Sequence, residues 1–285
     1  MPEVAIGLPT YNRPDFLEAA LRSLTTQTFG DFELLISDNA STHPDIRTIA
    51  ERYATADPRI RYVRQKTNLG AVGNFAHLFA NSTAPLFMWA ADDDLWEPIF
   101  VERAVAALRA DPTKAAWFCQ LDNIDAEGEV TRTYPPLTRL RSNGDKRREV
   151  RRFLMEPDRH GKVNLIYGMF RREAMAEPIR LMVANREMIG ADLVFVYAFI
   201  CRDDVAIDPD VLFHKRVVDR KGQRPRPPPG AGLLKSRHFA GFAAAAAGTP
   251  YAAMTRSLLP WRFVLDRVDK IGNGVRRSLF ARTQA

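Results

Sequence analysis

Three consecutive carboxylates, Asp92, Asp93 and Asp94, directly follow an apolar run over residues 86–91. Apolar runs of this length bounded by turn residues are typical of buried strands. Three acids at the end of a buried strand repel one another, so we expect a positive group beside them. Hard divalent cations bind such oxygen ligands, and Mg²⁺ takes one or two protein carboxylates together with substrate phosphates. The stretch therefore predicts a metal–diphosphate site, with a solvated acidic turn that caps the next helix as the alternative.

Length and composition indicate one large domain, or one domain with an appendage, at 285 residues. The contents of 46% hydrophobic and 26% charged residues are ordinary for a globular protein. Cys119 and Cys201 stand far apart and form no ligand pair or disulfide framework, which fits a reducing compartment. The chain runs from Met1 directly into its first strand, and no long apolar window follows. We therefore expect no signal peptide and no spanning helix, and a cytoplasmic location.

The net charge of +7 suggests an anionic partner. Nucleic acid, a membrane surface and a phosphorylated substrate all carry the complementary charge. The sequence has no helix-turn-helix, zinc-finger or aromatic single-strand-binding signature, so we expect no nucleic-acid partner.

Apolar runs alternate with helical patterns through the first 110 residues. We expect strands at residues 4–8, 32–37, 60–64 and 86–91, and helices at 15–26, 44–54 and 98–110, with a further helix that places Val72, Phe75, Ala76 and Phe79 on one face. Strand–helix alternation of this kind indicates βαβ units and a parallel sheet. Because polar clusters follow each strand, they should gather at one edge of that sheet, where open α/β sheets bind ligands.

Those clusters are Leu8-Pro9-Thr10-Tyr11-Asn12-Arg13, Ile36-Ser37-Asp38-Asn39-Ala40-Ser41-Thr42, Asn68-Leu69-Gly70 with Asn74, and Ala91-Asp92-Asp93-Asp94 with Pro98. In this order and spacing they resemble the nucleotide-binding half of inverting family 2 glycosyltransferases with the GT-A fold. The resemblance covers about the first 110 residues. One such motif would be weak, whereas all four together are specific.

The resemblance implies the substrate-binding residues Pro9, Thr10, Tyr11, Arg13, Asp38, Asn68, Gly70, Asn74 and Asp92. Pro9 and Tyr11 would border the nucleobase, and Asp38 would accept a hydrogen bond from it. The Asn68–Asn74 loop would close over the nucleoside, and Asp92 would hold the ribose.

The resemblance also implies that Asp93 ligates Mg²⁺ or Mn²⁺. The family often has an acid where this chain has Ala91, so an Asp-x-Asp pair could form only from Asp92 and Asp94. The register set by Pro98 favours Asp93. Asp94 is then a helix cap or a support for the metal ligand.

Purely structural interpretations of the same residues remain open. Tyr11 could be a core aromatic with a satisfied hydroxyl. Asp38 and Asn68 could be turn residues held by local backbone hydrogen bonds. The main rival fold, a dinucleotide-binding Rossmann domain, predicts Gly-x-Gly-x-x-Gly after the first strand, where this chain has Pro9-Thr10-Tyr11.

The second half begins with an expected hairpin at the sheet's edge, from strands at residues 115–124 and 130–134. The basic stretch 135–152 is either a solvated loop and helix face, or a wall near an anionic acceptor or donor phosphate. A strand is expected at 163–170. Further strands at 205–207 and 211–216 would close the half, and residues 219–232 have the composition of a linker or mobile loop.

Asp192 stands at the start of a helix whose Leu193, Val196, Tyr197 and Ile200 share a face. A helix N-terminus favours the ionised carboxylate that a general base needs. The resemblance implies that Asp192 is the catalytic base, and the alternative is a simple N-cap.

His214, Lys215 and Arg216 end the last expected strand. Some GT-A enzymes place a third metal ligand or a phosphate-binding cation there. His214 is thus a candidate metal ligand, or a partly buried polar residue without that role. Lys215 or Arg216 could contact the diphosphate.

The tail is Ala-rich and then amphipathic and basic, with Leu258, Trp261, Leu265, Val268 and Ile271 on its expected apolar side. It could lie on a membrane surface, at the inner face of the membrane, or pack on its own domain or on a second subunit as a homodimer. The Gln-x-x-Arg-Trp motif of processive family members is absent from the sequence, which favours transfer of one sugar per event.

We therefore expect an α/β protein with the GT-A fold, a Rossmann-like, mostly parallel sheet flanked by helices, with a helical C-terminal extension. Residues 1–112 would bind the nucleotide sugar, 113–218 the acceptor, and 219–285 would form a linker and basic helical tail.

The expected activity is a metal-dependent, inverting transfer of one sugar from a nucleotide-diphosphate sugar to a glycan or lipid-linked acceptor hydroxyl, in the synthesis of a polysaccharide, lipopolysaccharide or other glycoconjugate. A sugar-phosphate nucleotidyltransferase is the first alternative, although it should have a Gly-rich loop with Arg and Lys after the first strand. A catalytically inactive nucleotide-sugar-binding protein is the second, against which the intact acids argue.

Overall fold

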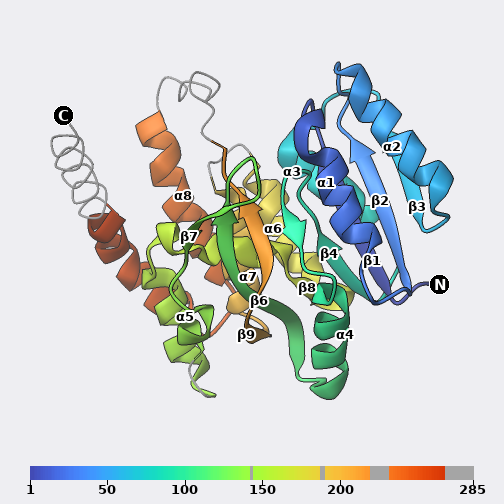
Figure 1. The fold of residues 1–285 in the computed structure, drawn as a ribbon. Helices are drawn as coiled ribbons and strands as arrows, with labels where there is room; N and C mark the ends of the chain where they lie inside the picture. The colour runs from blue at the N-terminus through green and yellow to red at the C-terminus, as the bar shows by residue number, and fades with distance from the viewer. Residues whose placement is uncertain (142–143, 187–189, 219–230, 267–285) are drawn as a thin grey trace, which may run out of the picture.

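A computed structural model describes residues 1–141, 144–186, 190–218 and 231–266, except for the side chains of residues 231–238. Its described strands form one mixed sheet in the order β3-β2-β1-β4-β8-β6-β9-β5, with β7 paired to β6. Helices flank this sheet on both sides (Figure 1). The expected α/β class is confirmed.

The N-terminal half is parallel, as predicted. Its strands are β1 (Val4–Thr10), β2 (Phe32–Asp38), β3 (Ile60–Arg64) and β4 (Leu86–Trp89). All residues of β4 are buried and nearly all of β1 and β2, which explains their continuous apolar runs, since a parallel strand is covered on both faces. The register pairs Thr10 with Asp38, so the first two strands end side by side.

Helices α1 (Pro14–Thr25) and α2 (Pro44–Ala56) lie side by side on one face of this half, and α3 (Gly70–Ala80) lies on the other (Figure 1). Helix α1 buries one apolar face, made of Leu17, Ala20, Leu21 and Leu24. Of the predicted face of α3, Val72, Phe75 and Phe79 are partly buried against the core, and the fully buried residues of the helix are Asn74 and Leu78. It approaches β1 closely, and a Cβ on Gly7 would come within 3.0 Å of the Leu78 Cβ.

The C-terminal half is built on two long strands that run parallel, β6 (Lys114–Ile124) and β9 (Asp204–Arg216). The hairpin partner β7 (Val130–Thr133) is confirmed on β6. The prediction of two strands at 205–207 and 211–216 was wrong, because β9 is continuous and absorbs the interruption as register shifts opposite Cys119–Leu121. Strand β5 (Leu95–Trp96) pairs with the end of β9, and α4 (Phe100–Ala110) follows it.

The predicted strand at 163–170 was also wrong over most of its length. Residues Lys162–Tyr167 form a 3₁₀ helix, and only Met169–Arg171 form a strand, β8. Lys162 is fully buried and its ammonium donates to the Phe153 and Glu156 carbonyls at 2.8 and 2.6 Å. Gly161 precedes it at φ 85°, a left-handed conformation that separates it from the 3₁₀ turn over Asp158–His160.

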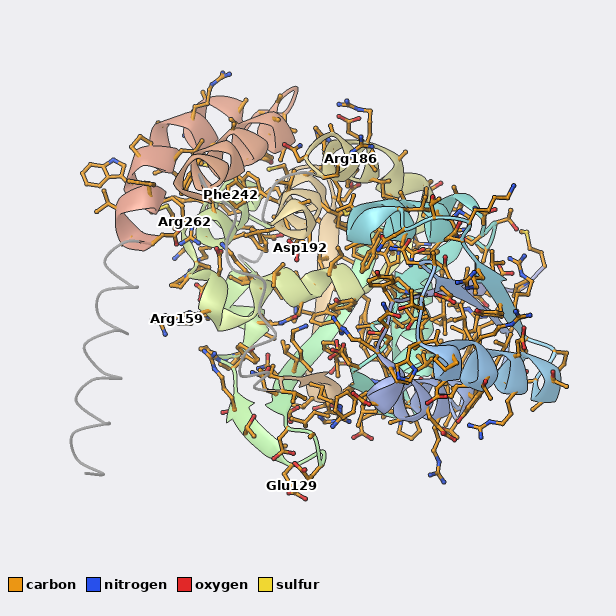
Figure 2. All side chains as sticks on the ribbon, turned by 90° about the horizontal axis from the view of Figure 1, so that it is seen from above. Glu129, Arg159, Arg186, Asp192, Phe242 and Arg262 are labelled. Atoms are coloured by element: carbon orange, nitrogen blue, oxygen red, sulfur yellow. The ribbon has the colours of Figure 1, made fainter. Side chains whose placement is uncertain are left out.

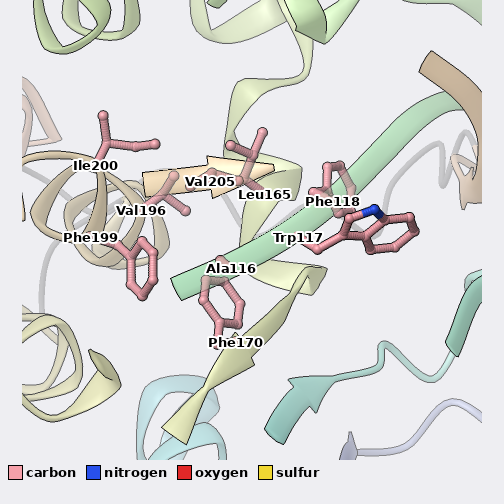
Figure 3. A pocket seen from close by; sticks show the side chains of 9 residues that line it. All are labelled: Ala116, Trp117, Phe118, Leu165, Phe170, Val196, Phe199, Ile200 and Val205. Atoms are coloured by element: carbon pink, nitrogen blue, oxygen red, sulfur yellow. The ribbon is translucent and has the colours of Figure 1, made fainter. Parts of the chain in front are cut away.

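Helix α7 (Ala191–Ile200) is apolar nearly all round and buried apart from Asp192. It packs between the sheet and the helices α5 (Lys146–Met155), α6 (Ala176–Ala184) and α8 (Ala231–Ala246). Figure 3 shows apolar side chains of α7, β6 and β8, among them Phe199 and Phe170, around a cavity of about 10 Å³. This junction is therefore tightly packed core, since a void of that size barely admits one water molecule.

In the basic stretch 135–152, several of the described basic side chains form ion pairs or hydrogen bonds within the protein. Arg139 pairs with Glu156, and Lys146 pairs with Asp204 and Glu149. Arg152 donates to the carbonyl oxygen of Arg141 at 2.8 Å.

The last described helix, residues 252–266, packs on its own domain (Figure 2). Its buried residues are Thr255, which contacts the Tyr197 hydroxyl at 2.6 Å, and Arg262, which pairs with Asp158 at 2.6 Å. On the predicted apolar side, Leu258 is partly buried against the core, whereas Trp261 and Leu265 are exposed and do not pack on the domain. Ion pairing of a buried Arg262 fixes the helix's rotation instead. Val268 and Ile271 lie outside the described residues.

Candidate functional site

A cavity of about 560 Å³ opens at the carboxyl ends of the parallel strands. Its volume is in the range of small-molecule sites. The loops after all four N-terminal strands contribute to its lining, together with two segments of the C-terminal half. The lining residues are Pro9, Thr10, Tyr11, Arg13, Asn39, Asn68, Gly70, Ala71, Asn74, Phe75, Ala91, Asp92, Asp93, Tyr167, Lys215 and Arg216. The structure thus brings together every predicted substrate-binding residue except Asp38, and also Asp93.

The first loop is held in place by Asn12, which adopts a left-handed conformation at φ 53°. Its side-chain oxygen accepts hydrogen bonds from the backbone N–H groups of Thr42 and His43 at 2.8 and 3.0 Å. These groups stand at the N-terminus of α2, so Asn12 fastens the first loop to the second. Asn tolerates this conformation better than most residues, and the contact leaves Tyr11 facing the cavity, 44% exposed.

The second and third loops are joined by Asn39, a lining residue that the sequence reasoning did not single out. Its amide nitrogen donates to the Asn68 side-chain oxygen at 2.9 Å, and its oxygen accepts from the Leu69 N–H at 2.7 Å. Asn74 is buried and exchanges hydrogen bonds with Ser37 in β2. The amide-rich wall of the cavity is therefore a connected network.

The acidic turn forms the opposite wall. The Arg13 Nη1 atom lies 3.2 Å from Asp92 Oδ1 and forms a short ion pair with Asp93 Oδ2. Burial raises the pKa of Asp92 to about 6, an effect that the Arg13 charge opposes and the Asp93 charge increases. A positive group therefore stands beside the two carboxylates, as their mutual repulsion requires.

Asp94 faces away from this wall. Its Oδ1 accepts a hydrogen bond from the Arg216 N–H at 2.8 Å, and Lys215 Nζ lies 3.8 Å from its Oδ2. Burial raises the Asp94 pKa to about 7, against the lowering effect of Lys215. The prediction of a helix cap was wrong, because β5 intervenes and α4 begins only at Phe100. Asp94 instead holds the end of β9.

The described part of the lining does not include Asp38 or His214. Asp38 is 1% exposed, with Oδ1 bound to the Ser41 N–H at 2.7 Å and Oδ2 to the Tyr62 hydroxyl at 2.8 Å. The two ring nitrogens of His214 lie 2.7 Å from Asp122 Oδ1 and 2.9 Å from Glu97 Oε1. Both side chains are thus engaged outside the cavity.

Asp192 occupies the first turn of α7, exposed at the helix start, where its Oδ1 accepts from the Leu193 N–H at 2.8 Å (Figure 2). The N-cap position belongs to Gly190. One turn further on, Phe195 packs edge-on against Trp89 of β4 at 5.2 Å. Asp192 also contributes to raising the pKa of Tyr167, a lining residue, above its usual range, although burial is the main cause. The base candidate is not among the described residues that line the cavity.

A divalent cation fits the oxygens of the acidic turn. Asp93 Oδ2 faces the cavity and contacts a cation, the Arg13 guanidinium. Mg²⁺ and Mn²⁺ prefer such oxygen ligands, and Mg²⁺ needs only one or two carboxylates beside substrate phosphates. In the described residues no group of three or more His, Cys, Asp or Glu side chains gathers. A bound cation would thus take part of its ligands from the protein and the rest from the substrate.

Three lining residues from the C-terminal half extend the predicted site. Tyr167, Lys215 and Arg216 reach the cavity across the sheet. Lys215 Nζ stands over the Tyr167 ring at 5.2 Å. Arg216 is fixed by donating to the carbonyl oxygens of Asp93 at 3.0 Å and Ala126 at 2.8 Å. The basic run at the end of β9 was the sequence signal for the cations, whereas nothing marked Tyr167.

Solved structures with the same fold are glycosyltransferases of the GT-A class. Residues 1–349 of S. aureus TarS in complex with UDP-GlcNAc superpose with a TM-score of 0.61 at 16% identity, covering 90% of this chain and 70% of that chain. The mannosyltransferase PcManGT from Pyrobaculum calidifontis, in complex with GDP-Man and Mn²⁺, gives 0.53 at 18% identity, covering 94% and 88%. The fold is therefore GT-A.

The chain belongs to glycosyl transferase family 2, whose model matches residues 5–175. Among curated relatives, chondroitin synthase of Escherichia coli is 30% identical over 131 residues, 46% of this chain and 19% of that protein. The putative glycosyltransferase EpsE of Bacillus subtilis is 31% identical over 108 residues, 38% of each chain. The matched stretch thus spans well under half of these relatives.

Across the described residues, the helices are too short or too polar to cross a bilayer.

Proposed function

We propose that this glycosyltransferase moves one sugar from a nucleotide-diphosphate sugar to an acceptor hydroxyl, with inversion at the anomeric carbon and with Mg²⁺ or Mn²⁺ as cofactor. The observation that carries the proposal is the convergence of four post-strand loops on one cavity, with Asp92 and Asp93 on one wall and an amide network on the other. TarS and PcManGT, which share the fold, were solved with UDP-GlcNAc and with GDP-Man and Mn²⁺.

The two walls suit the two ends of a nucleotide sugar. Tyr11 and Pro9 offer a partly exposed aromatic and an apolar ring for a nucleobase, and the Asn39–Asn68 network stands beside them. Asp92 would accept a hydrogen bond from a ribose hydroxyl. The carboxylate of Asp93 would hold the cation, whose chemistry when bound is to neutralise charge on the departing diphosphate. The Asp38 contact with the base stays a prediction, since that carboxylate is already bound to Ser41 and Tyr62.

The chain's own residues would carry the proton transfer. Asp192, ionised at the start of α7, would take the proton from the acceptor hydroxyl as its oxygen attacks the anomeric carbon. One base suffices, because direct displacement needs no covalent enzyme intermediate. Lys215 lines the cavity with one counter-ion, Asp94, at 3.8 Å. Its ammonium would stand beside the leaving phosphate and retain it until displacement is complete.

The alternatives predict other features. A nucleotidyltransferase needs a Gly-rich, basic loop to hold a triphosphate, whereas the first loop here runs Pro9-Thr10-Tyr11-Asn12-Arg13-Pro14. A non-catalytic binding protein has no use for a carboxylate at Asp192. Transfer of single sugars, an acceptor on a glycan or lipid carrier, and a role in envelope polysaccharide synthesis in the cytoplasm or at the inner membrane face remain predictions from the sequence.

The proposal is tested by a thermal-shift screen of nucleotide sugars with and without Mn²⁺, followed by product analysis. A ligand that binds only the folded protein raises its melting temperature. The donor with the largest metal-dependent shift should then be hydrolysed slowly to free nucleotide. NMR should show that the released sugar has the inverted anomeric configuration. Absence of any shift and of any hydrolysis across UDP- and GDP-sugars would reject the proposal.

A further inference from the structure

One guanidinium bridges the two carboxylates that face the cavity. Arg13 Nη1 contacts Asp92 Oδ1 at 3.2 Å and pairs with Asp93 Oδ2, across about 80 residues of sequence. Burial of Asp92, at 5% exposure, makes an uncompensated charge there costly. Arg13 therefore offsets part of the negative charge of the acidic wall.

One of these two carboxylates, that of Asp93, is also the group that a divalent cation would use. A cation at Asp93 Oδ2 and the Arg13 guanidinium cannot both occupy that position, and two positive charges a few ångströms apart repel each other strongly in a partly buried site. Metal binding must therefore move Arg13 away from the carboxylates.

Arg13 is freer to move than the neighbouring Arg216. Arg216 donates to the backbone carbonyls of Asp93 and Ala126. The Arg13 side chain is 38% exposed and makes both of its carboxylate contacts through one nitrogen. A guanidinium has five N–H donors in a fork that matches phosphate oxygens.

We infer that Arg13 is a resident counter-ion that exchanges partners: it holds Asp92 and Asp93 in the free protein and passes to the diphosphate when metal enters with the nucleotide. This inference rests on the proposed function. It predicts that metal alone binds weakly, because it competes with Arg13, and that metal and nucleotide diphosphate strengthen each other's binding by the same factor. The donor would therefore load as a metal complex.

The test measures Mn²⁺ affinity of the full chain by electron paramagnetic resonance, first with Mn²⁺ alone and then with UDP or GDP present. Arg13→Gln should raise the affinity for Mn²⁺ alone by about tenfold or more, and should shrink the enhancement that nucleotide provides. Arg13→Lys keeps a competing charge and should behave like the wild type. Arg52→Gln removes one charge from an exposed pair with Glu18, remote from the cavity, and should change neither affinity.

Equal Mn²⁺ affinity in wild type and Arg13→Gln, including no detectable binding by either, would overturn the inference, and so would an equal gain in Arg13→Lys. Failure of the proposed function would look different. In that case neither UDP nor GDP would bind any variant, while the measurement with Mn²⁺ alone would still decide the role of Arg13.

Discussion

The backbone N–H of Arg216 donates to Asp94 Oδ1 at 2.8 Å, across 122 residues of sequence. The last residue of β9 is thereby fastened to the last acid of the turn after β4. The Arg216 guanidinium returns the contact through the Asp93 carbonyl at 3.0 Å. The backbone that carries Asp93 is held by the C-terminal half, so both halves of the domain are needed to shape the acidic wall.

Asp93→Ala should lower the transfer rate by at least about a hundredfold, because the cation that neutralises the leaving diphosphate loses its ligand. The measurement is the steady-state rate with the donor found by the thermal-shift screen. Asp45→Ala, which removes a largely exposed acid at the start of α2, is the control. Wild-type activity in Asp93→Ala would remove Asp93 from the metal site.

Asp192→Asn should lower the transfer rate by about 10²–10⁴-fold while nucleotide and Mn²⁺ still bind, because the amide keeps the shape of the side chain but cannot accept the acceptor's proton. Calorimetric titration with nucleotide and Mn²⁺ separates the two effects. If the variant transfers sugar normally, another group is the base.

Asn39→Ala should weaken nucleotide binding and destabilise the fold by about 1 kcal/mol, because the Leu69 N–H and the Asn68 oxygen lose their hydrogen bonds to the Asn39 amide. Urea unfolding and nucleotide titration measure the two losses. Asn81→Ala, at the exposed end of α3, serves as the comparison. Equal losses in both variants would argue against a special role for the Asn39 junction.

Asp94 should make stability fall as pH rises from about 4 to about 7. Its pKa is raised to about 7 in the folded protein, mainly by burial, from an ordinary value of 3.8. Between these values the native state binds more protons than the unfolded state, so the free energy of unfolding decreases with pH. Asp94→Asn should lose this dependence and gain stability relative to wild type over that window. Urea unfolding at several pH values measures it, and parallel curves would refute the assignment.

Arg262→Ala should lower the free energy of unfolding by about 3 kcal/mol, because a fully buried guanidinium is removed from Asp158 and Asp266. The nearby Lys162 would keep a contact with Asp158 at 3.2 Å. Arg256→Ala, on the exposed side of the same helix, should change stability by less than about 0.5 kcal/mol. Similar effects of the two substitutions would mean that Arg262 does not anchor the helix.

The parallel half and its site were predictable because each rests on local patterns. Continuous apolar runs fixed the strands, and the polar clusters after them, from Pro9 to Asp93, converge as the topology requires. Two of the failures share one cause, which is burial of a polar side chain by distant partners. Lys162 is drawn into the core by backbone carbonyls, and a strand pattern becomes a 3₁₀ helix. Arg262 is paired with Asp158, and the tail helix presents Trp261 to solvent instead of to the domain.

The predicted site residues also divide into those that line the cavity and those that are engaged elsewhere by distant partners. Asp38 and Asn39 are neighbours in one turn, yet Tyr62 from the next strand takes the carboxylate and leaves the amide to the cavity. His214 ends β9 beside Lys215, but Asp122 and Glu97 engage its ring. Alternation along a strand sends adjacent residues to opposite faces, and a single sequence does not show which face meets the cavity.

The chain contains four tryptophans, of which Trp89, Trp96 and Trp117 are at most 3% exposed and Trp261 is 65% exposed. A collisional quencher such as acrylamide should therefore extinguish the Trp261 emission selectively. Loss of that quenching upon addition of lipid vesicles, or upon raising the protein concentration, would reveal whether bilayer or sister subunit shields the tail. Fluorescence quenching of Trp261 thus measures directly whether this surface of the tail is covered.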